Sequence, residues 1–404
     1  MMRPYTEPDA VPFSPAGPHD QPLEFDAAET ICTHLGEAAM EVGGPAALPI
    51  YQASTFVYPS CADFEARKRP DSPYFEYTRV GNPTTAVLQT KLAALEKGRW
   101  CYVLASGMSA IVAALNSSLH AGAHVVACGQ CYWPARRYMV NYLPRFGVDT
   151  TFVPTLNPDD YLAALRPETR VLYLESPTSG TIEPMDYEAL AHEARKRGVV
   201  SIIDNSWAGP TYSNPLEFGV DMVVHSATKY IGGHSDVVAG AVIGRDAELQ
   251  KRVFREVELV GGTTDPFAAW LMLRGLRTLS LRIKQMEQSA LAVARRLAAH
   301  PAVRRVSHPG LEGSASRAIV QKYFRGTGSL FSFELREQTK EAAYRFVDRL
   351  KLFSIGVSWG GHESLALAGQ WFSDPRSPCW TVRLHCGLEA TTDLVADVEQ
   401  ALQA

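Results

Sequence analysis

Short apolar segments alternate with longer helical segments from about residue 82 onward, and this alternation constrains the fold more than any other feature. The apolar segments have the length and composition of buried β-strands. They are Cys101–Leu104, His124–Ala127, Thr150–Val153, Val171–Leu174, Val200–Ile203, Met222–Val224 and Ala239–Ile243. The helical candidates between them are Ala110–Leu119, Ala135–Leu143, Asp159–Leu165 and Tyr187–Arg197. The alternation predicts an α/β fold with a mostly parallel, seven-stranded sheet that is covered on both faces.

The pattern changes near residue 275, where a second, smaller domain is predicted to begin. Leu279–Ala298 has apolar residues at helical spacing and predicts a long amphipathic helix. Strands are predicted at Leu330–Leu335 and Thr381–His385, and helices at Glu341–Leu350 and Thr392–Leu402. We therefore expect a large domain over residues 82–274 and a C-terminal α+β domain over residues 275–404.

The first 81 residues lack the strand–helix alternation. Residues 1–25 are rich in proline and predict a flexible extension. A helix is predicted over Ala27–Glu41, and residues 44–75 predict an extended N-terminal arm.

Composition excludes several classes of partner. The net charge of −4 favours neither nucleic acid nor an anionic membrane as a partner. The chain has no apolar run of membrane-spanning length and no signal-peptide pattern at its N-terminus, so a cytoplasmic protein is expected. Cys128 and Cys131 have C-x-x-C spacing but lack a second pair at metal-site spacing, and no metal site is predicted.

One lysine and one acid follow two of the predicted strands. Lys229 comes shortly after the strand Met222–Val224, and Asp204 directly follows Val200–Ile203. Ligands of parallel sheets bind beyond the carboxyl ends of the strands. A lysine in a dry pocket loses its charge easily and can form a Schiff base with a carbonyl cofactor. Pyridoxal 5′-phosphate (PLP) uses such a lysine and needs an acid against its pyridinium nitrogen, so PLP is the predicted cofactor.

Other segments offer groups that suit the same cofactor. The turn Ala105–Ala110 precedes a predicted helix and is either an anion site or an ordinary tight turn. Tyr132 is placed to stack on a pyridine ring or simply to pack. The hydroxyls of Ser226 and Thr228 can donate to a phosphate. Arg383 alternates with apolar residues on a predicted strand, and it suits either a substrate carboxylate or a structural ion pair.

Several motifs in order give the chain a resemblance to a known family. They are Pro-Ile-Tyr-Gln-Ala-Ser-Thr-Phe (49–56), Tyr-Thr-Arg-Val-Gly-Asn-Pro-Thr (77–84), Ser-Gly-Met-Ser-Ala-Ile (106–111), Glu-Ser-Pro (175–177), Ile-Asp-Asn-Ser-Trp (203–207), Ser-Ala-Thr-Lys-Tyr (226–230) and Arg-Leu-His-Cys-Gly-Leu-Glu (383–389). From about residue 30 to its end, the chain resembles the Cys/Met-metabolism PLP-dependent enzymes, of the aspartate aminotransferase-like fold type I.

The resemblance implies roles for named residues. Lys229 is then the Schiff-base lysine, Asp204 the partner of the pyridinium and Tyr132 the stacking residue. The residues implied to hold the phosphate are Gly107, Met108, Ser226 and Thr228, with Tyr77 and Arg79 reaching it from a neighbouring subunit. The resemblance also implies a homotetramer built from two dimers.

The motifs favour one reaction within the family. Tyr132-Trp-Pro, Gly-His-Ser-Asp (233–236) and Ser-Trp-Gly-Gly-His-Glu-Ser-Leu (358–365) are similar to cystathionine β-lyases, whereas residues 77–82 and Ser226 are more like the γ-enzymes. We predict α,β-elimination of cystathionine to homocysteine, pyruvate and ammonia, with Lys229 and Tyr132 as catalytic residues. Arg383, Ser358 and Trp359 are the predicted substrate-binding residues.

Other readings of the motifs stay open. The alternatives to β-elimination are cystathionine γ-synthase, cystathionine γ-lyase, methionine γ-lyase and a non-catalytic regulator with the same fold. The segment Ala368–Pro378, with Trp371 and Phe372, is either a pocket lining or a surface loop.

Overall fold

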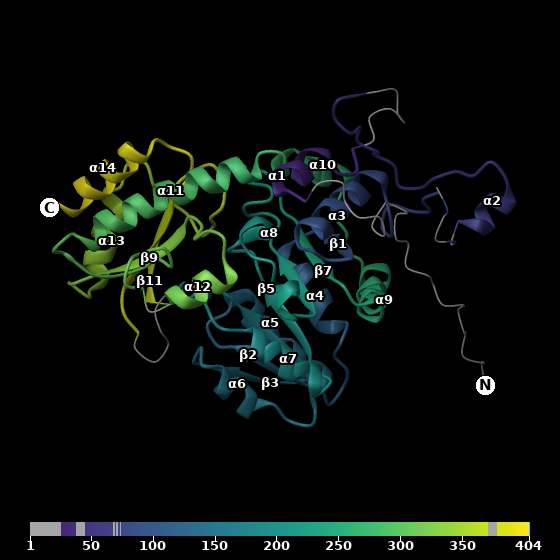
Figure 1. Cartoon of the computed structure of the whole chain (residues 1–404), viewed down its shortest axis with the longest axis horizontal. Helices are drawn as coiled ribbons and strands as arrows, with labels where there is room; N and C mark the ends of the chain where they lie inside the picture. The colour runs from purple at the N-terminus through teal and green to yellow at the C-terminus, as the bar shows by residue number, and fades with distance from the viewer. Residues whose placement is uncertain are drawn as a thin grey trace.

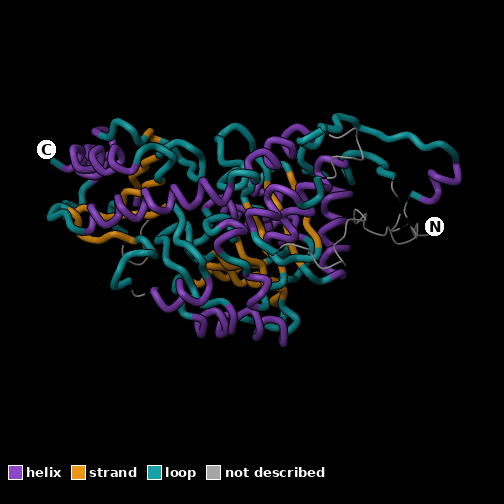
Figure 2. Tube along the Cα trace, turned by 45° about the horizontal axis from the view of Figure 1, so that its top comes forward, coloured by secondary structure: helices purple, strands orange, loops and turns teal. Residues whose placement is uncertain are grey.

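A computed structural model describes residues 26–37, 45–67, 69, 72, 74–314, 316–370 and 378–403. A seven-stranded sheet lies at the centre of the molecule, and a five-stranded sheet lies to one side of it (Figure 1). The strands form two separate groups in a second view as well (Figure 2). The predicted extension over residues 1–25 and the segment 371–377, with Trp371 and Phe372, lie outside the described residues.

The large sheet has the strand order β1-β7-β6-β5-β4-β2-β3. Its strands are β1 Trp100–Leu104, β2 His124–Cys128, β3 Asp149–Val153, β4 Thr169–Glu175, β5 Val200–Asp204, β6 Met222–His225 and β7 Gly240–Gly244. Each lies within two residues of its predicted position. Only β7 runs antiparallel to its neighbours, β1 and β6, so the prediction of a mostly parallel sheet is confirmed.

Helices cover the large sheet on both faces. Successive residues of a strand point to opposite faces, and every residue of β1, β2, β6 and β7 is buried. The helices and shorter turns around this sheet are α3 Pro83–Leu95, α4 Gly107–Asn116, α5 Trp133–Asn141, η2 Leu143–Phe146, α6 Pro158–Ala164, α7 Glu188–Lys196, α8 Gly209–Tyr212, η3 Pro215–Phe218, α9 Ala247–Arg255, η4 Glu256–Val260 and α10 Pro266–Leu276.

The second sheet has the order β10-β11-β12-β9-β8. Its strands are β8 Val303–Ser307, β9 Leu330–Leu335, β10 Ser354–Ile355, β11 Leu365–Gly369 and β12 Thr381–His385. Its helices are α11 Leu279–Ala298, α12 Arg317–Tyr323, α13 Lys340–Arg349 and α14 Thr391–Leu402. Helix α11 runs from the large sheet to the small one (Figure 1). The domain boundaries at residues 82 and 275 stay a prediction.

In the N-terminal part, helix α1 packs on the body, and the segment that carries the short helix α2 projects from it as an arm (Figure 1). Helix α1 spans Ala28–His34 and ends before the predicted Glu41, because Gly36 adopts a φ of 74° that an α-helix does not allow. The arm continues through the short helix α2, Cys61–Ala66, and is joined to itself by an isolated bridge between Thr55 and Tyr77.

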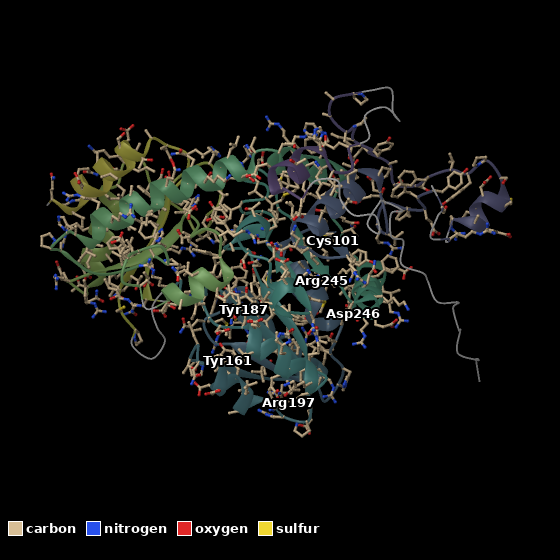
Figure 3. All side chains as sticks on the ribbon, viewed as in Figure 1. Cys101, Tyr161, Tyr187, Arg197, Arg245 and Asp246 are labelled. Carbon is tan, nitrogen blue, oxygen red and sulfur yellow. The ribbon has the colours of Figure 1, made fainter. Side chains whose placement is uncertain are left out.

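Side chains at the junction of β7 and α9 fix the end of α3. The Arg245 guanidinium donates to the carbonyl oxygens of Lys97 (2.6 Å) and Leu216 (3.0 Å). The neighbouring Asp246 carboxylate accepts from the backbone N–H of Leu249 at 2.8 Å and so caps α9 (Figure 3). The turn that follows α3 is therefore held against the large sheet.

Within the described ranges, no helix is both long enough and apolar enough to cross a membrane.

Candidate active site

Lys229 lies in a turn that follows β6 and points toward the small sheet. Its backbone N–H donates to the Ser226 carbonyl oxygen at 3.1 Å. Its Nζ donates to the Ser358 Oγ at 2.7 Å and lies 5.5 Å from the centre of the Trp359 ring. The structure thus brings together the predicted Schiff-base lysine and two predicted substrate-binding residues that are 129 positions or more away in sequence.

The environment of Lys229 favours the neutral amine. Burial is the main cause, and the nearby Arg383 guanidinium adds to it, so the Lys229 pKa falls to about 8. The Asp204 carboxylate opposes this change but is outweighed. An amine with such a pKa exchanges protons readily near neutral pH.

Asp204 is the last residue of β5 and is buried. One carboxylate oxygen accepts from the backbone N–H of Ser206 at 3.0 Å. Burial raises the Asp204 pKa, whereas the bonds from Ser206 and the charges of His225 and Lys229 lower it. A buried carboxyl group without a bound cation is costly, and a protonated ring nitrogen would supply that cation.

Glu175 is a second buried carboxyl group beside Asp204 that the sequence analysis did not single out. It ends β4, directly opposite Asp204 in the sheet register. Its carboxyl oxygens accept from the backbone N–H groups of Tyr132 (2.7 Å) and Ser179 (2.6 Å). Burial, together with the charge of Asp204, raises the Glu175 pKa to about 8. Its position at a strand end, like that of Asp204, was the available signal in the sequence.

Tyr132 immediately precedes α5, and its ring is partly exposed. The bond from its N–H to Glu175 fixes the start of that helix near the carboxyl ends of β4 and β5. Burial and the charges of Asp204 and Glu175 raise the pKa of its hydroxyl, so the phenol is kept neutral. These interactions place Tyr132 near Asp204, as the predicted stacking role requires.

Gly107 and Met108 begin α4, where backbone N–H groups point out of the helix. A Cβ atom on Gly107 would lie 2.9 Å from the Cβ of Ser226, so only glycine lets these two segments approach so closely. Ser226 is held in turn by the Ser206 Oγ, which accepts from its backbone N–H at 2.6 Å. The helix start and the Ser226 hydroxyl therefore form one concave cradle that fits a phosphate.

Thr228 has other partners. Its hydroxyl donates to the Ala239 carbonyl oxygen and accepts from the Ala239 N–H, both at 3.1 Å. To donate to a phosphate, as predicted, the hydroxyl would have to release the Ala239 carbonyl oxygen.

Arg383 lies on β12 and is almost fully buried. One of its guanidinium nitrogens donates to the carbonyl oxygen of Val357 at 2.6 Å. Burial lowers its pKa to about 10, so it remains a cation at neutral pH. It lies close enough to Lys229 for the two charges to interact, as a binding site for a substrate carboxylate would require.

Tyr77 and Arg79 lie in the N-terminal arm and are exposed. Arg79 donates to the carbonyl oxygen of Glu258 in η4 and lies 5.9 Å from the Tyr77 ring. Among the described residues, no hydrogen bond joins either side chain to Lys229, Asp204 or Ser226. Their predicted role in a neighbouring subunit's site stays a prediction.

A family model described as "Cys/Met metabolism PLP-dependent enzyme" matches residues 29–403. The chain belongs to this family. Its members include L-methionine gamma-lyase of Fusobacterium nucleatum subsp. polymorphum, which is 37% identical over 91% of this chain and 98% of its own length. Cystathionine gamma-lyase of Bacillus subtilis is 34% identical over 93% of this chain and 99% of its own length.

A solved structure shares the fold of this Cys/Met-metabolism enzyme. The metY protein of Campylobacter jejuni has a TM-score of 0.86 and 28% identity, covering 93% of this chain and 99% of its own. It contains a lysine covalently modified with pyridoxyl phosphate. The family, the fold type I architecture and PLP as the cofactor are therefore as predicted.

The side chains of this enzyme fit PLP. The cradle of Gly107, Met108 and Ser226 would hold the phosphate, and the buried Asp204 carboxylate would pair with the ring nitrogen. When bound, PLP supplies an electron sink for the carbanion chemistry of amino acids.

Proposed function

We propose that this enzyme is a carbon–sulfur lyase that releases a thiol from a γ-substituted sulfur amino acid. The observation that carries the proposal is the Lys229 amine, buried beside Asp204 and Arg383, with a pKa near 8. γ-Elimination requires protons to be removed from two carbon atoms, and an amine with this pKa can take up and return protons repeatedly near neutral pH. The methionine and cystathionine gamma-lyases among its relatives support this choice over the predicted β-elimination.

The residues have complementary roles in this proposal. Arg383 binds the α-carboxylate of the substrate, since a guanidinium grips a carboxylate through two parallel hydrogen bonds. Lys229 Nζ removes the α-proton and Ser358, which accepts a hydrogen bond from that amine, orients it. Tyr132 would cover the ring of bound PLP and keep water away from it.

A second candidate is the β-elimination of cystathionine. Trp359 favours it only through its motif, since residues 358–365 are similar to cystathionine β-lyases; in the structure its ring lies 5.5 Å from the Lys229 amine and packs edge-on against Tyr230 at 5.4 Å. The motif that contains Trp359 was one of the three motifs on which the β-lyase prediction rested.

The keto acid formed from cystathionine distinguishes the candidates. We expect 2-oxobutyrate with cysteine, measured by mass spectrometry of the reaction products. Pyruvate with homocysteine would replace the γ-lyase proposal with β-elimination. Two further assays run in parallel. Turnover of methionine would reveal a methionine lyase, and turnover of O-acylhomoserine with cysteine would reveal a synthase. If the protein binds PLP but turns over none of these substrates, the result would support a non-catalytic regulator with this fold.

We also propose that the enzyme acts as a homotetramer in the cytoplasm, in which Tyr77 and Arg79 complete a neighbouring site. Exposed apolar side chains on the arm and beside the Glu258 carbonyl that binds Arg79 support an interface there. Val57 is 88% exposed, and Leu259 and Val260, which follow the Glu258 carbonyl that binds Arg79, are 78% and 73% exposed.

A further inference from the structure

A buried polar cluster of Glu96, Asn205 and His225 lies outside the groups assigned above. Glu96 directly follows α3, and its side chain is fully buried. Its Oε1 atom lies 2.5 Å from the Nε2 of His225, and the same oxygen accepts from the Asn205 side-chain amide at 2.8 Å. His225 and Asn205 are themselves buried.

The two partners of Glu96 adjoin the residues of the cofactor site. Asn205 directly follows Asp204 at the end of β5, and its backbone N–H donates to the Val224 carbonyl oxygen at 3.0 Å. His225 ends β6, four residues before Lys229. A single carboxylate oxygen therefore joins the end of β5, which carries the acid, to the end of β6, which the lysine follows.

We propose that Glu96 is a positioning residue of the cofactor site. It fixes the ends of β5 and β6 relative to each other, and so sets the place of the Asp204 carboxylate with respect to Lys229. Glu96 also accepts a hydrogen bond from the Nε2–H of His225. This bond holds the imidazole where its charge lowers the pKa of Asp204. The proposal does not depend on which sulfur amino acid is the substrate.

Two physical arguments support a role beyond ordinary packing. A buried carboxylate is costly unless several donors surround it, and here Asn205 and His225 come from the segments that bear the site, while the Asn214 amide makes a longer contact of 3.5 Å with the other carboxylate oxygen. Moreover, the charge of His225 lowers the pKa of Asp204 and so favours the ionised form that a protonated ring nitrogen needs. Loss of Glu96 would weaken both the geometry and this charge balance.

The test compares Glu96→Ala and Glu96→Gln in the PLP-loaded enzyme. We expect Glu96→Ala to raise the dissociation constant for PLP about tenfold or more, as the loss of hydrogen bonds to a charged group predicts. The pH at which the visible absorption of bound PLP changes should also rise. A ring nitrogen that is less firmly protonated withdraws less electron density from the Lys229 nitrogen, which therefore keeps its proton to a higher pH. Glu96→Gln keeps an acceptor oxygen, so it should restore much of the affinity while leaving the midpoint displaced.

A matched control is Glu37→Gln. Glu37 is another largely buried carboxylate, which pairs with Lys91 (2.6 Å) and Arg277 (2.8 Å) below α1, away from the strand ends. The Glu37→Gln substitution should lower the melting temperature without changing the affinity for PLP or the pH midpoint of its absorption. Glu96 variants that behave like this control would overturn the proposal. If Glu96→Ala does not fold, an unchanged midpoint in Glu96→Gln would overturn it equally.

Discussion

At the scale of single residues, the first prediction concerns the Lys229 amine. Because burial and Arg383 lower its pKa to about 8, the enzyme freed of PLP should expose a neutral amine at unusually low pH. We expect the rate of acylation of Lys229, followed by mass spectrometry of its peptide, to rise with a midpoint near pH 8. The lowered pKa also means that the folded chain binds fewer protons than the unfolded one just above pH 8, so this group adds stability as the pH rises toward its ordinary pKa.

The Arg383→Gln variant is the control for this prediction. Without the guanidinium, the repulsion on the Lys229 ammonium falls, and the midpoint of acylation should move to higher pH. A midpoint that stays in place would show that Arg383 does not act on the lysine.

The sequence identified Lys229 and Asp204 because each follows a short apolar strand, and polar groups at strand ends meet at one edge of a parallel sheet. Glu175 carried the same signal but was quoted only as part of a motif. Glu96 offered no local signal. Its partners Asn205 and His225 are 109 and 129 residues away, and such a contact depends on the tertiary fold.

At the scale of elements, the buried strands of the large sheet were the most predictable part of the chain, because both of their faces are covered and their residues are mostly apolar. Strand β8 was missed because it lies at a sheet edge and carries the exposed residues Arg304 and Arg305. Strand β11, with the sequence Leu-Ala-Leu-Ala-Gly, was missed because alanine and glycine have low β-propensity. In both strands, pairing with neighbours decides the structure, and local sequence does not.

The second prediction concerns the junction of β4 and α5. Glu175→Ala removes the acceptor for the N–H groups of Tyr132 and Ser179. Each unpaired buried N–H costs on the order of 1–3 kcal/mol, so the free energy of unfolding should fall. Tyr132 should also lose its fixed position, which would raise KM more than it lowers kcat. Thermal unfolding and steady-state kinetics measure the two effects.

Glu175→Gln is the matched variant, because its amide keeps one acceptor oxygen. It should recover part of the stability, because the amide oxygen can accept one of the two N–H groups. Equal loss of stability in the Ala and Gln variants would contradict the assigned role of the two N–H bonds.

At the scale of the whole molecule, the loop before β11 in the small domain packs against the turn that carries Lys229 in the large one. Gly360, in the loop before β11, has a φ of 84°, and a Cβ there would lie 3.0–3.1 Å from the backbone of Lys229 and Tyr230. Gly360→Ala should therefore push Ser358 and Trp359 away from the lysine and lower kcat/KM about tenfold, given 1–2 kcal/mol of strain. The control is Gly122→Ala. Gly122 has a φ of 85° but open space around its Cβ position, so its replacement should affect stability alone.

The last prediction asks whether one chain suffices for a site. Tyr77 and Arg79 are exposed on an arm that projects from the body, as expected if they serve another subunit (Figure 1). Lys229→Ala and Arg79→Ala should each be inactive alone, yet unfolding and refolding them together should restore activity. A mixed dimer would contain one site with both native residues, so random pairing restores about a quarter of the native activity. If Arg79 served its own chain, every site in the mixture would lack one residue, and no activity would return.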